Sequence, residues 1–350
     1  MLESLHNHTT ASDGEMSHET FLNEAAANGI GIVGFTDHDS LPSLSTVTHL
    51  RDLSRENPAL PKWIVGIEMS SGLPKELGGQ PYSGLHIVGI FVNPENQTLI
   101  DHCARSKQAR IERMAEMVAN LRRLGFSISE ADCLLASEGE SVGRPHIVRA
   151  LVWHPPVAKC DQPAARPPRE PGCDGPAEGA HAPGGPEQER YQRILDEPTQ
   201  EPYTLFLADG AFIPGVYVEY KYTLDMDSCV RLIREAGGLA ILAHPCTCKS
   251  KIPLAMAEQM LAEGRFDGIE VVFGKERDAA DRAAARDIAE RLRTRMPPVV
   301  MGGGGDIHTL EGMREWSAAP WAQQTRGLLE ALLAARPDLK TTWSSLAQSS

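Results

Sequence analysis

The sequence has no run of lysines and arginines, and its 34 basic residues are outnumbered by 47 acidic ones, which gives a net charge of −13. Proteins that bind long nucleic acids draw much of their affinity from basic side chains that neutralise phosphates. The chain also lacks a stretch in which aromatic and basic residues interleave, as they do in surfaces that stack single strands. We therefore expect no long nucleic acid as a partner. A small phosphorylated molecule, or a short oligonucleotide held by a metal, is compatible with this charge.

Long apolar runs are missing too. None approaches the roughly 20 residues that span a bilayer, and the N-terminus lacks the basic and apolar regions of a signal peptide. The seven cysteines are an odd number scattered over 350 residues, which is not the density of a disulfide scaffold. These absences predict a protein of the reducing cytoplasm with no membrane partner. They say nothing about the oligomeric state.

Short apolar runs alternate with helical patterns at both ends of the chain. Strands are predicted for residues 2–6 and for the runs GIVGFTDHD, WIVGIEMS and LHIVGIFV, and a helix for SHETFLNEAAANG with Ser17 as its N-cap. The alternation returns with the strands LAILAHP, FDGIEVVF and PPVVMGGGGDIH. Continuous apolar runs are typical of strands buried on both faces, and interleaved helices favour a parallel sheet or a barrel.

The middle of the chain has a different pattern. Residues 98–222 are predicted to be mostly helical, and the stretch 155–187 within them is so rich in proline and glycine that we predict disorder or a surface excursion. We therefore expect a discontinuous α/β barrel formed by residues 1–97 and 223–350. Residues 98–222 would be an inserted domain that covers the substrate.

Histidines and acids lie in or beside the predicted strands. His6 and His8 are two residues apart in an extended segment, so their imidazoles would point to the same face, and Asp306 and His308 have the same spacing. In β/α barrels the carboxyl ends of the strands meet at one mouth. We therefore expect nine side chains to converge there: His6, His8, Asp13, His38, Glu68, His86, His244, Asp306 and His308.

Each of these histidines, taken singly, is better explained as a hydrogen-bonded core residue. The whole series favours a metal site, because imidazoles and carboxylates together suit manganese, zinc or iron better than they suit a metal that prefers thiolates. Nine candidate ligands are too many for one ion. They indicate two or three ions, with a carboxylate such as Glu68 as a bridge.

The segments HNHTTASDG, TDHDSL, GIE, HIVG, AHP and GDIH together resemble the successive motifs of the PHP (polymerase and histidinol phosphatase) family of metal-dependent phosphoesterases. The branch they resemble acts on nucleoside monophosphates such as AMP and on 3′,5′-nucleotide bisphosphates. The resemblance implies a distorted (β/α)7 TIM-like barrel with a trinuclear site. Manganese would be the metal, with zinc or iron as alternatives.

The resemblance also implies how the ligands are shared. One ion would be bound by His6, His8, Glu68 and Asp306, a second by Glu68, His86 and His244, and a third by Asp13, His38 and His308. Asp13, Glu68 and Asp306 are the expected catalytic residues. Asp37 and Asp39 would fix the tautomer of a ligand histidine, with loop capping as the alternative role.

A GRPH-like motif of the same branch is matched by Gly143-Arg144-Pro145-His146. The resemblance implies that Arg144 binds a substrate phosphate, because a guanidinium can hold phosphate oxygens in bidentate fashion. His146 is a further candidate for substrate binding.

These features predict a hydrolase that removes phosphate from a small nucleotide. A water shared by two divalent ions loses its proton near neutral pH, and the resulting hydroxide would attack phosphorus in line. A 5′→3′ exonuclease on short RNA and a non-catalytic PHP domain supported by metal are the alternatives. Three features depart from the family's pattern: the thiols of Cys246 and Cys248, the run GGGG before Asp306, and the stretch 155–187, where the family has an ordered connection.

Overall fold

A computed structural model describes residues 1–78, 85–124, 126, 128–137, 141–152, 189, 193–194, 203–208, 210–211, 213–245, 252–295, 297–341 and 344–345. The predicted disordered stretch 155–187 lies outside these residues, as do Cys246 and Cys248. The chain divides into two compact units. Unit 1 comprises Met1–Ala109, Gly139–Ser141 and Lys221–Ser350, and unit 2 comprises Arg110–Glu138 and Val142–Tyr220. Compactness alone does not test independent folding, so the predicted domain boundaries stay a prediction.

The described residues of unit 1 form one sheet of eight strands: β1 (Leu2–Ser4), β2 (Ile30–Phe35), β3 (Lys62–Gly72), β4 (Leu85–Ile90), β5 (Leu224–Asp225), β6 (Leu239–Leu242), β7 (Gly268–Val272) and β8 (Val300–Gly303). The strand order is β1-β2-β3-β4-β6-β7-β8, and β5 pairs with β3. Every pair is parallel except those of β4, which is antiparallel to both β3 and β6. The predicted α/β class is confirmed, but a wholly parallel sheet is not what the chain forms.

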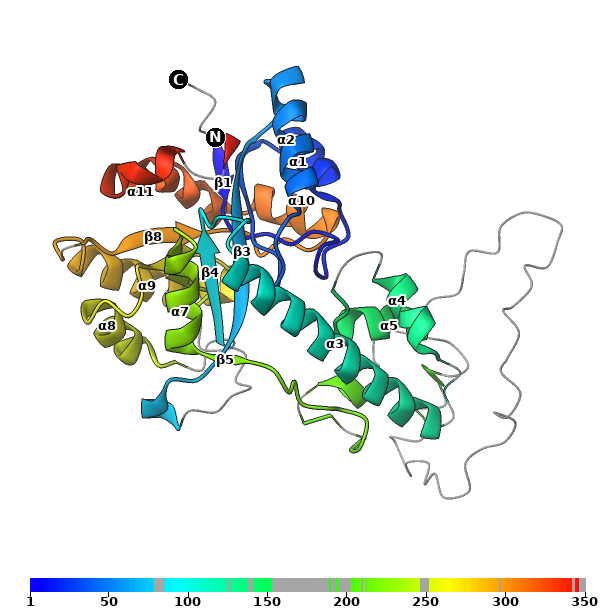
Figure 1. The fold of residues 1–350 in the computed structure, drawn as a ribbon. Coiled ribbons are helices and arrows are strands. Elements are labelled where there is room, and N and C mark those ends of the chain that lie inside the picture. Colours follow the sequence, from blue (N-terminus) through cyan, green and yellow to red (C-terminus); the bar gives the residue numbers. More distant parts are fainter. Residues whose placement is uncertain are drawn as a thin grey trace. The chain divides into compact units, whose positions relative to one another are not determined.

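Helices lie around these strands in unit 1 (Figure 1). They are α1 (His18–Ala27), α2 (Leu44–Glu56), α7 (Met226–Glu235), α8 (Leu254–Ala262), α9 (Ala279–Arg291), α10 (Leu310–Ala318) and α11 (Leu328–Ala335). Short 3₁₀ segments cover Lys75–Leu77, Glu276–Asp278, Pro320–Thr325 and Pro337–Thr341. Ser17 caps α1 as predicted, because its hydroxyl accepts the N–H of Thr20. No helix within the described residues is long and apolar enough to cross a membrane.

The strands are buried on both faces, which explains their continuous apolar sequences. Ile87 of β4 packs into the large core that also contains residues of α1, α7 and α9, whereas its neighbour Val88 packs into a second core with residues of α11. The same alternation separates Leu242 from Ile241 in β6. Polar side chains buried in this unit are therefore exceptions that call for a specific partner.

The segment that follows β1 is hydrogen bonded to the last residue of β8 and to the segment after it. The N–H of Leu5 donates to the carbonyl of Gly303 at 3.0 Å, and the N–H of Asp306 donates to the carbonyl of His6 at 3.0 Å. A Cβ at Gly304 would overlap the backbone nitrogen and Cβ of His6. The glycine run before Asp306 therefore allows a close approach that sets the Asp306 backbone against His6.

Unit 2 contains the C-terminal part of α3 (Gln97–Arg123), together with α4 (Glu130–Ala136), α5 (Arg144–Val152) and a π-helical turn at Tyr203–Leu207. It has a hydrophobic core of its own, in which the rings of Phe126 and Phe206 meet edge to face with centroids 5.1 Å apart. This core gives unit 2 a framework for the polar side chains described below.

Candidate metal centre

All nine side chains predicted to converge lie in unit 1, and they come together. His6 and His8 follow β1, and His38 follows β2. His244 follows β6, and Asp306 and His308 follow β8. His86 is the second residue of β4, but it belongs to the same end of the sheet because β4 runs antiparallel, with Ser70 of β3 as its partner. The convergence was predictable from the strand ends; the reversed direction of β4 was not.

Glu68 is the centre of this arrangement. It lies in β3, is fully buried, and has five imidazoles around its carboxylate. Its Oε1 lies 3.2 Å from Nε2 of His6, 2.9 Å from Nδ1 of His86 and 3.1 Å from Nε2 of His244; its Oε2 lies 3.3 Å from Nε2 of His8 and 2.9 Å from Nδ1 of His38. A carboxylate surrounded in this way is suited to bridging cations that these imidazoles could also hold.

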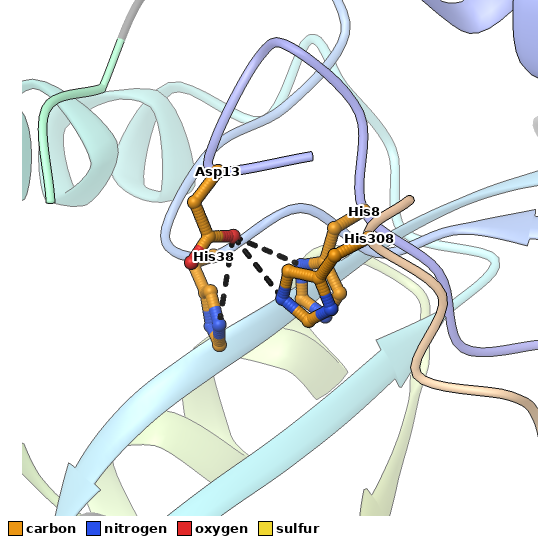
Figure 2. Close-up of side chains that lie close together, drawn as sticks. All are labelled: His8, Asp13, His38 and His308. Carbon is orange, nitrogen blue, oxygen red and sulfur yellow. Dashed lines mark ion pairs between the residues drawn. The ribbon is translucent and has the colours of Figure 1, made fainter. Parts of the chain in front are cut away.

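Asp13 lies at the same site, and three histidines surround its carboxylate (Figure 2). Its Oδ1 lies 3.3 Å from Nε2 of His308, 3.9 Å from Nε2 of His38 and 3.9 Å from Nδ1 of His8. His38 therefore faces Glu68 with one ring nitrogen and Asp13 with the other. The groups of donor atoms overlap more than the family resemblance implies.

The donor atoms fit divalent cations. They form three groups in which all atoms lie within 4.8 Å of one another: His6, His8, Glu68 and Asp306; His8, Asp13, His38 and His308; and His38, Glu68 and His86. Metal bonds of about 2.0–2.2 Å place neighbouring ligands about 3.0–3.5 Å apart, close to the separations seen here. Several buried donors, among them Nε2 of His6, Nδ1 of His38 and Nδ1 of His86, lie close to Glu68 but are not aligned to form a hydrogen bond. Such atoms are expected where an ion binds.

The electrostatics of the cluster are those of buried acids beside imidazoles. Burial opposes the charged form of His8, but Asp306 and Glu68 outweigh it and raise the pKa of His8 to about 10. Burial likewise disfavours the carboxylate of Glu68, but the surrounding imidazoles hold its pKa well below its ordinary value. For His38, burial lowers the pKa. Protons on some imidazoles thus balance the acids when no cation is bound.

Asp37 has the loop-capping role that the sequence analysis gave as its alternative. Its carboxylate accepts the N–H of Thr9 at 2.7 Å and the hydroxyl of Ser12 at 2.7 Å. Asp37 therefore holds the loop that leads to Asp13. The carboxylate of Asp39 accepts the N–H of Ser70 at 3.0 Å, which links the loop after β2 to β3.

Glu270 is a buried acid at this site that the sequence analysis missed. Its Oε1 lies 3.0 Å from Nδ1 of His6, and its Oε2 accepts the N–H of His244 at 2.6 Å. The signal that could have revealed it is a single carboxylate inside the apolar run FDGIEVVF.

The two predicted substrate-binding residues belong to unit 2. Arg144 begins α5, and one of its N–H groups donates to the carbonyl of Leu207 at 3.1 Å. His146 is fully buried, and its Nδ1 accepts the N–H of Gly143 at 2.8 Å, which shapes the turn before the helix.

Arg144 is one member of an alternating row of arginines and tyrosines in unit 2. In order the row is Tyr203, Arg144, Tyr217, Arg113, Tyr220 and Arg110, with each guanidinium carbon 5.2–5.9 Å from the neighbouring ring centroids. Burial, and then the charges of Arg144 and Arg110, lower the pKa of Arg113 to about 10. We call this set the arginine–tyrosine row. Its positive charges favour an anion as a ligand, and its rings supply the aromatic–basic surface that the sequence alone did not reveal.

The chain has relatives among curated proteins, although no family model matches it. It is 26% identical over 309 residues to the phosphoribosyl 1,2-cyclic phosphate 1,2-diphosphodiesterase of Eggerthella lenta, covering 88% of this chain and 94% of that one. It is 28% identical to the 5′-3′ exoribonuclease Rnm of Salmonella typhimurium, over 43% of this chain and 48% of that one. It is 25% identical to the 3′,5′-nucleoside bisphosphate phosphatase of Chromobacterium violaceum, over 42% and 48%.

Solved structures share the fold. An amidohydrolase from Chromobacterium violaceum with bound sulfate matches with a TM-score of 0.60 and 19% identity, covering 88% of each chain. A proposed metal-dependent phosphoesterase from Bifidobacterium adolescentis matches with a TM-score of 0.57 and 21% identity, covering 87% of each chain. These curated relatives are phosphoesterases, and the solved structures share the fold of this chain. The predicted resemblance to the PHP type is confirmed.

Proposed function

We propose that the chain is a metal-dependent phosphatase that hydrolyses a phosphomonoester of a small nucleotide, either a 3′,5′-nucleotide bisphosphate or a nucleoside monophosphate. The observation that carries the proposal is the buried carboxylate of Glu68 among five imidazoles. The phosphoesterase relatives, which include a nucleoside bisphosphate phosphatase, support the nucleotide-like substrate.

The metal content that we propose is two to three divalent ions, with manganese as the first candidate and zinc or iron as alternatives. The three overlapping donor groups support more than one ion. When bound, such ions supply an activated water and neutralise charge on the phosphoryl oxygens. We also propose that the sheet closes as a (β/α)7 barrel, which the hydrogen bonds between the segments after β1 and β8 support.

The exposure of the cluster indicates the side from which a phosphate would approach. His6, His8 and Glu68 are fully buried, whereas Asp306, His86 and His308 retain 17%, 25% and 31% of their side-chain exposure. The buried residues hold the geometry and exclude water. The partly exposed ones border the space that a phosphoryl group would enter.

Arg144 is proposed to bind a phosphate of the substrate. His146 stays a candidate for substrate binding, and it also shapes the turn before Arg144. The guanidinium carbon of Arg144 lies 5.2 Å from the ring centroid of Tyr203 and 5.9 Å from that of Tyr217, and these two contacts restrict the orientation of the guanidinium. Such a group is suited to bidentate contacts with phosphate oxygens.

A 5′→3′ exoribonuclease is the second candidate, because an exoribonuclease is among the relatives and because the arginine–tyrosine row can stack bases. The row removes one of the two sequence-based arguments against this activity. The net charge of −13 still weighs against long RNA.

A substrate panel tests the proposal. The chain, stripped with EDTA and reloaded with Mn²⁺, is offered 3′-phosphoadenosine 5′-phosphate, AMP, histidinol phosphate, a cyclic ribose phosphate and a 5′-phosphorylated oligoribonucleotide. We expect release of inorganic phosphate from one of the first two. Turnover of the oligonucleotide alone would establish the exonuclease instead, and no turnover of any substrate with metal bound would overturn the hydrolase.

A further inference from the structure

We propose that Glu270 is a positioning residue of the metal centre, whose two carboxylate oxygens fix the ring of His6 and the backbone of His244 so that both histidines present Nε2 to Glu68. The inference rests on the proposed function, since it assigns a task within that centre. It concerns a residue outside the nine predicted ligands.

The strand that carries Glu270 directs it toward the cluster. Its neighbours in β7, Ile269 and Val271, pack into the large hydrophobic core. Because side chains alternate along a strand, Glu270 points to the opposite face. Its partner across the ladder is Gly302 of β8, which has no side chain to compete for this space.

The contact with His6 defines which nitrogen of that ring is free. Oε1 of Glu270 lies 3.0 Å from Nδ1 of His6, and both side chains are buried. An ionised carboxylate only accepts hydrogen bonds, so Nδ1 of His6 must carry the proton. Nε2 is thereby left to face Glu68, at 3.2 Å from its Oε1. This is the arrangement by which carboxylates orient metal-binding histidines.

The contact with His244 secures an unusual backbone conformation. His244 has a φ of +27°, a region that residues other than glycine rarely adopt. Oε2 of Glu270 accepts its N–H at 2.6 Å, and the ring places Nε2 at 3.1 Å from Oε1 of Glu68. Glu270 thus contacts both His6 and His244, which follow separate strands. Both histidines place Nε2 beside the same oxygen of Glu68, Oε1.

The substitution Glu270→Gln separates this role from simple packing. Glutamine has nearly the same shape but only one accepting oxygen, so it cannot accept from both His6 and His244. If its amide faces His6, it donates to Nδ1 and moves the ring proton to Nε2. We expect Mn²⁺ affinity, measured by calorimetry, to fall about 10- to 100-fold. The matched control Glu56→Gln removes an exposed glutamate of α2 and should bind as the unaltered chain does.

A second measurement needs no variant and therefore does not depend on whether Glu270→Gln folds. The unaltered chain is labelled with ¹⁵N-histidine, loaded with Zn²⁺ and studied by long-range ¹H–¹⁵N NMR. We expect the His6 ring to show a protonated Nδ1 and a coordinated Nε2. A His6 ring with the proton on Nε2, or a Glu270→Gln variant that binds Mn²⁺ as tightly as Glu56→Gln, would overturn the inference.

The outcomes for Glu270 and for the proposed function are distinguishable. If the chain binds metal through the expected His6 tautomer but hydrolyses none of the phosphate esters, the role of Glu270 stands and the proposed function falls. If it hydrolyses an ester while Glu270→Gln keeps full metal affinity, only the role of Glu270 falls.

Discussion

Unit 1 and unit 2 each contain a cluster of polar side chains, but the two clusters differ in charge and in burial. In unit 1, imidazoles and carboxylates from strand ends surround the fully buried Glu68. In unit 2, guanidinium groups alternate with tyrosine side chains that remain partly exposed. The first set is built to attract cations and the second to attract anions. A hydrolase of phosphate esters needs both kinds of chemistry, and in this chain they belong to different units.

The largest loss of activity is expected for Glu68→Gln in unit 1. It removes the charge that faces five imidazoles, so metal binding and hydrolysis should fail together, with kcat/KM lower by about 10³-fold or more. Steady-state kinetics and metal analysis of the same samples check this. Glu56→Gln should change neither quantity, and a Glu68→Gln variant with full activity would contradict the role of the cluster.

Arg144→Met tests whether the arginine–tyrosine row of unit 2 binds the substrate. A hydrogen bond to a charged group contributes about 1.5–3 kcal/mol, so the KM for a nucleotide substrate should rise about 10- to 100-fold. The Mn²⁺ content should stay unchanged because Arg144 is not among the metal-ligand candidates. Kinetics and metal analysis distinguish the two effects, with exposed Arg293→Met as the control. A variant with unchanged KM would remove Arg144 from substrate binding.

The cation-binding character of unit 1 also predicts a pH dependence. Burial opposes protonation of His8, but Asp306 and Glu68 raise its pKa to about 10 in the absence of metal. Below that pH a metal must displace a proton from His8, so binding releases protons and affinity rises with pH. The expected slope is about tenfold per pH unit for each proton displaced. Calorimetry in buffers of different ionisation enthalpy would count these protons, and binding without proton release would contradict the prediction.

The smallest expected effect concerns the close contact between Gly304 and His6, which lies beside the ligand candidates His6 and Asp306. In Gly304→Ala the new methyl group would overlap the backbone of His6, and such crowding costs about 1–3 kcal/mol. Urea unfolding of the metal-free protein should show this loss. Gly302→Ala, whose Cβ would lie 3.1 Å from a methyl group of Ile241, should cost less. Equal stability of Gly304→Ala and the unaltered chain would show that the segment can move aside.

The sequence was informative wherever strand periodicity places side chains. The i, i+2 spacings of His6 with His8 and of Asp306 with His308 predict pairs that share a face, and the structure brings both pairs to Glu68 or Asp13. Their binding of metal remains a prediction. The direction of β4 could not be predicted from the sequence, because buried parallel and antiparallel strands have the same kind of apolar run.

Contacts between side chains from distant segments account for most of what was missed. The task of Glu270 depends on β7 lying beside β6, a neighbour relation that no local pattern encodes. The arginine–tyrosine row has a similar origin: Arg110 and Arg113 precede Tyr217 and Tyr220 by about a hundred residues of chain. Such pairings arise from tertiary packing, and only Arg144 could be found beforehand, through a motif.

The metal content of the purified protein tests the central claim most directly. The chain is loaded with excess Mn²⁺, freed of unbound metal by gel filtration and analysed by elemental mass spectrometry against protein concentration. The three overlapping donor groups around Glu68 and Asp13 predict two to three equivalents per chain. Fewer than two equivalents would contradict a centre in which Glu68 bridges ions.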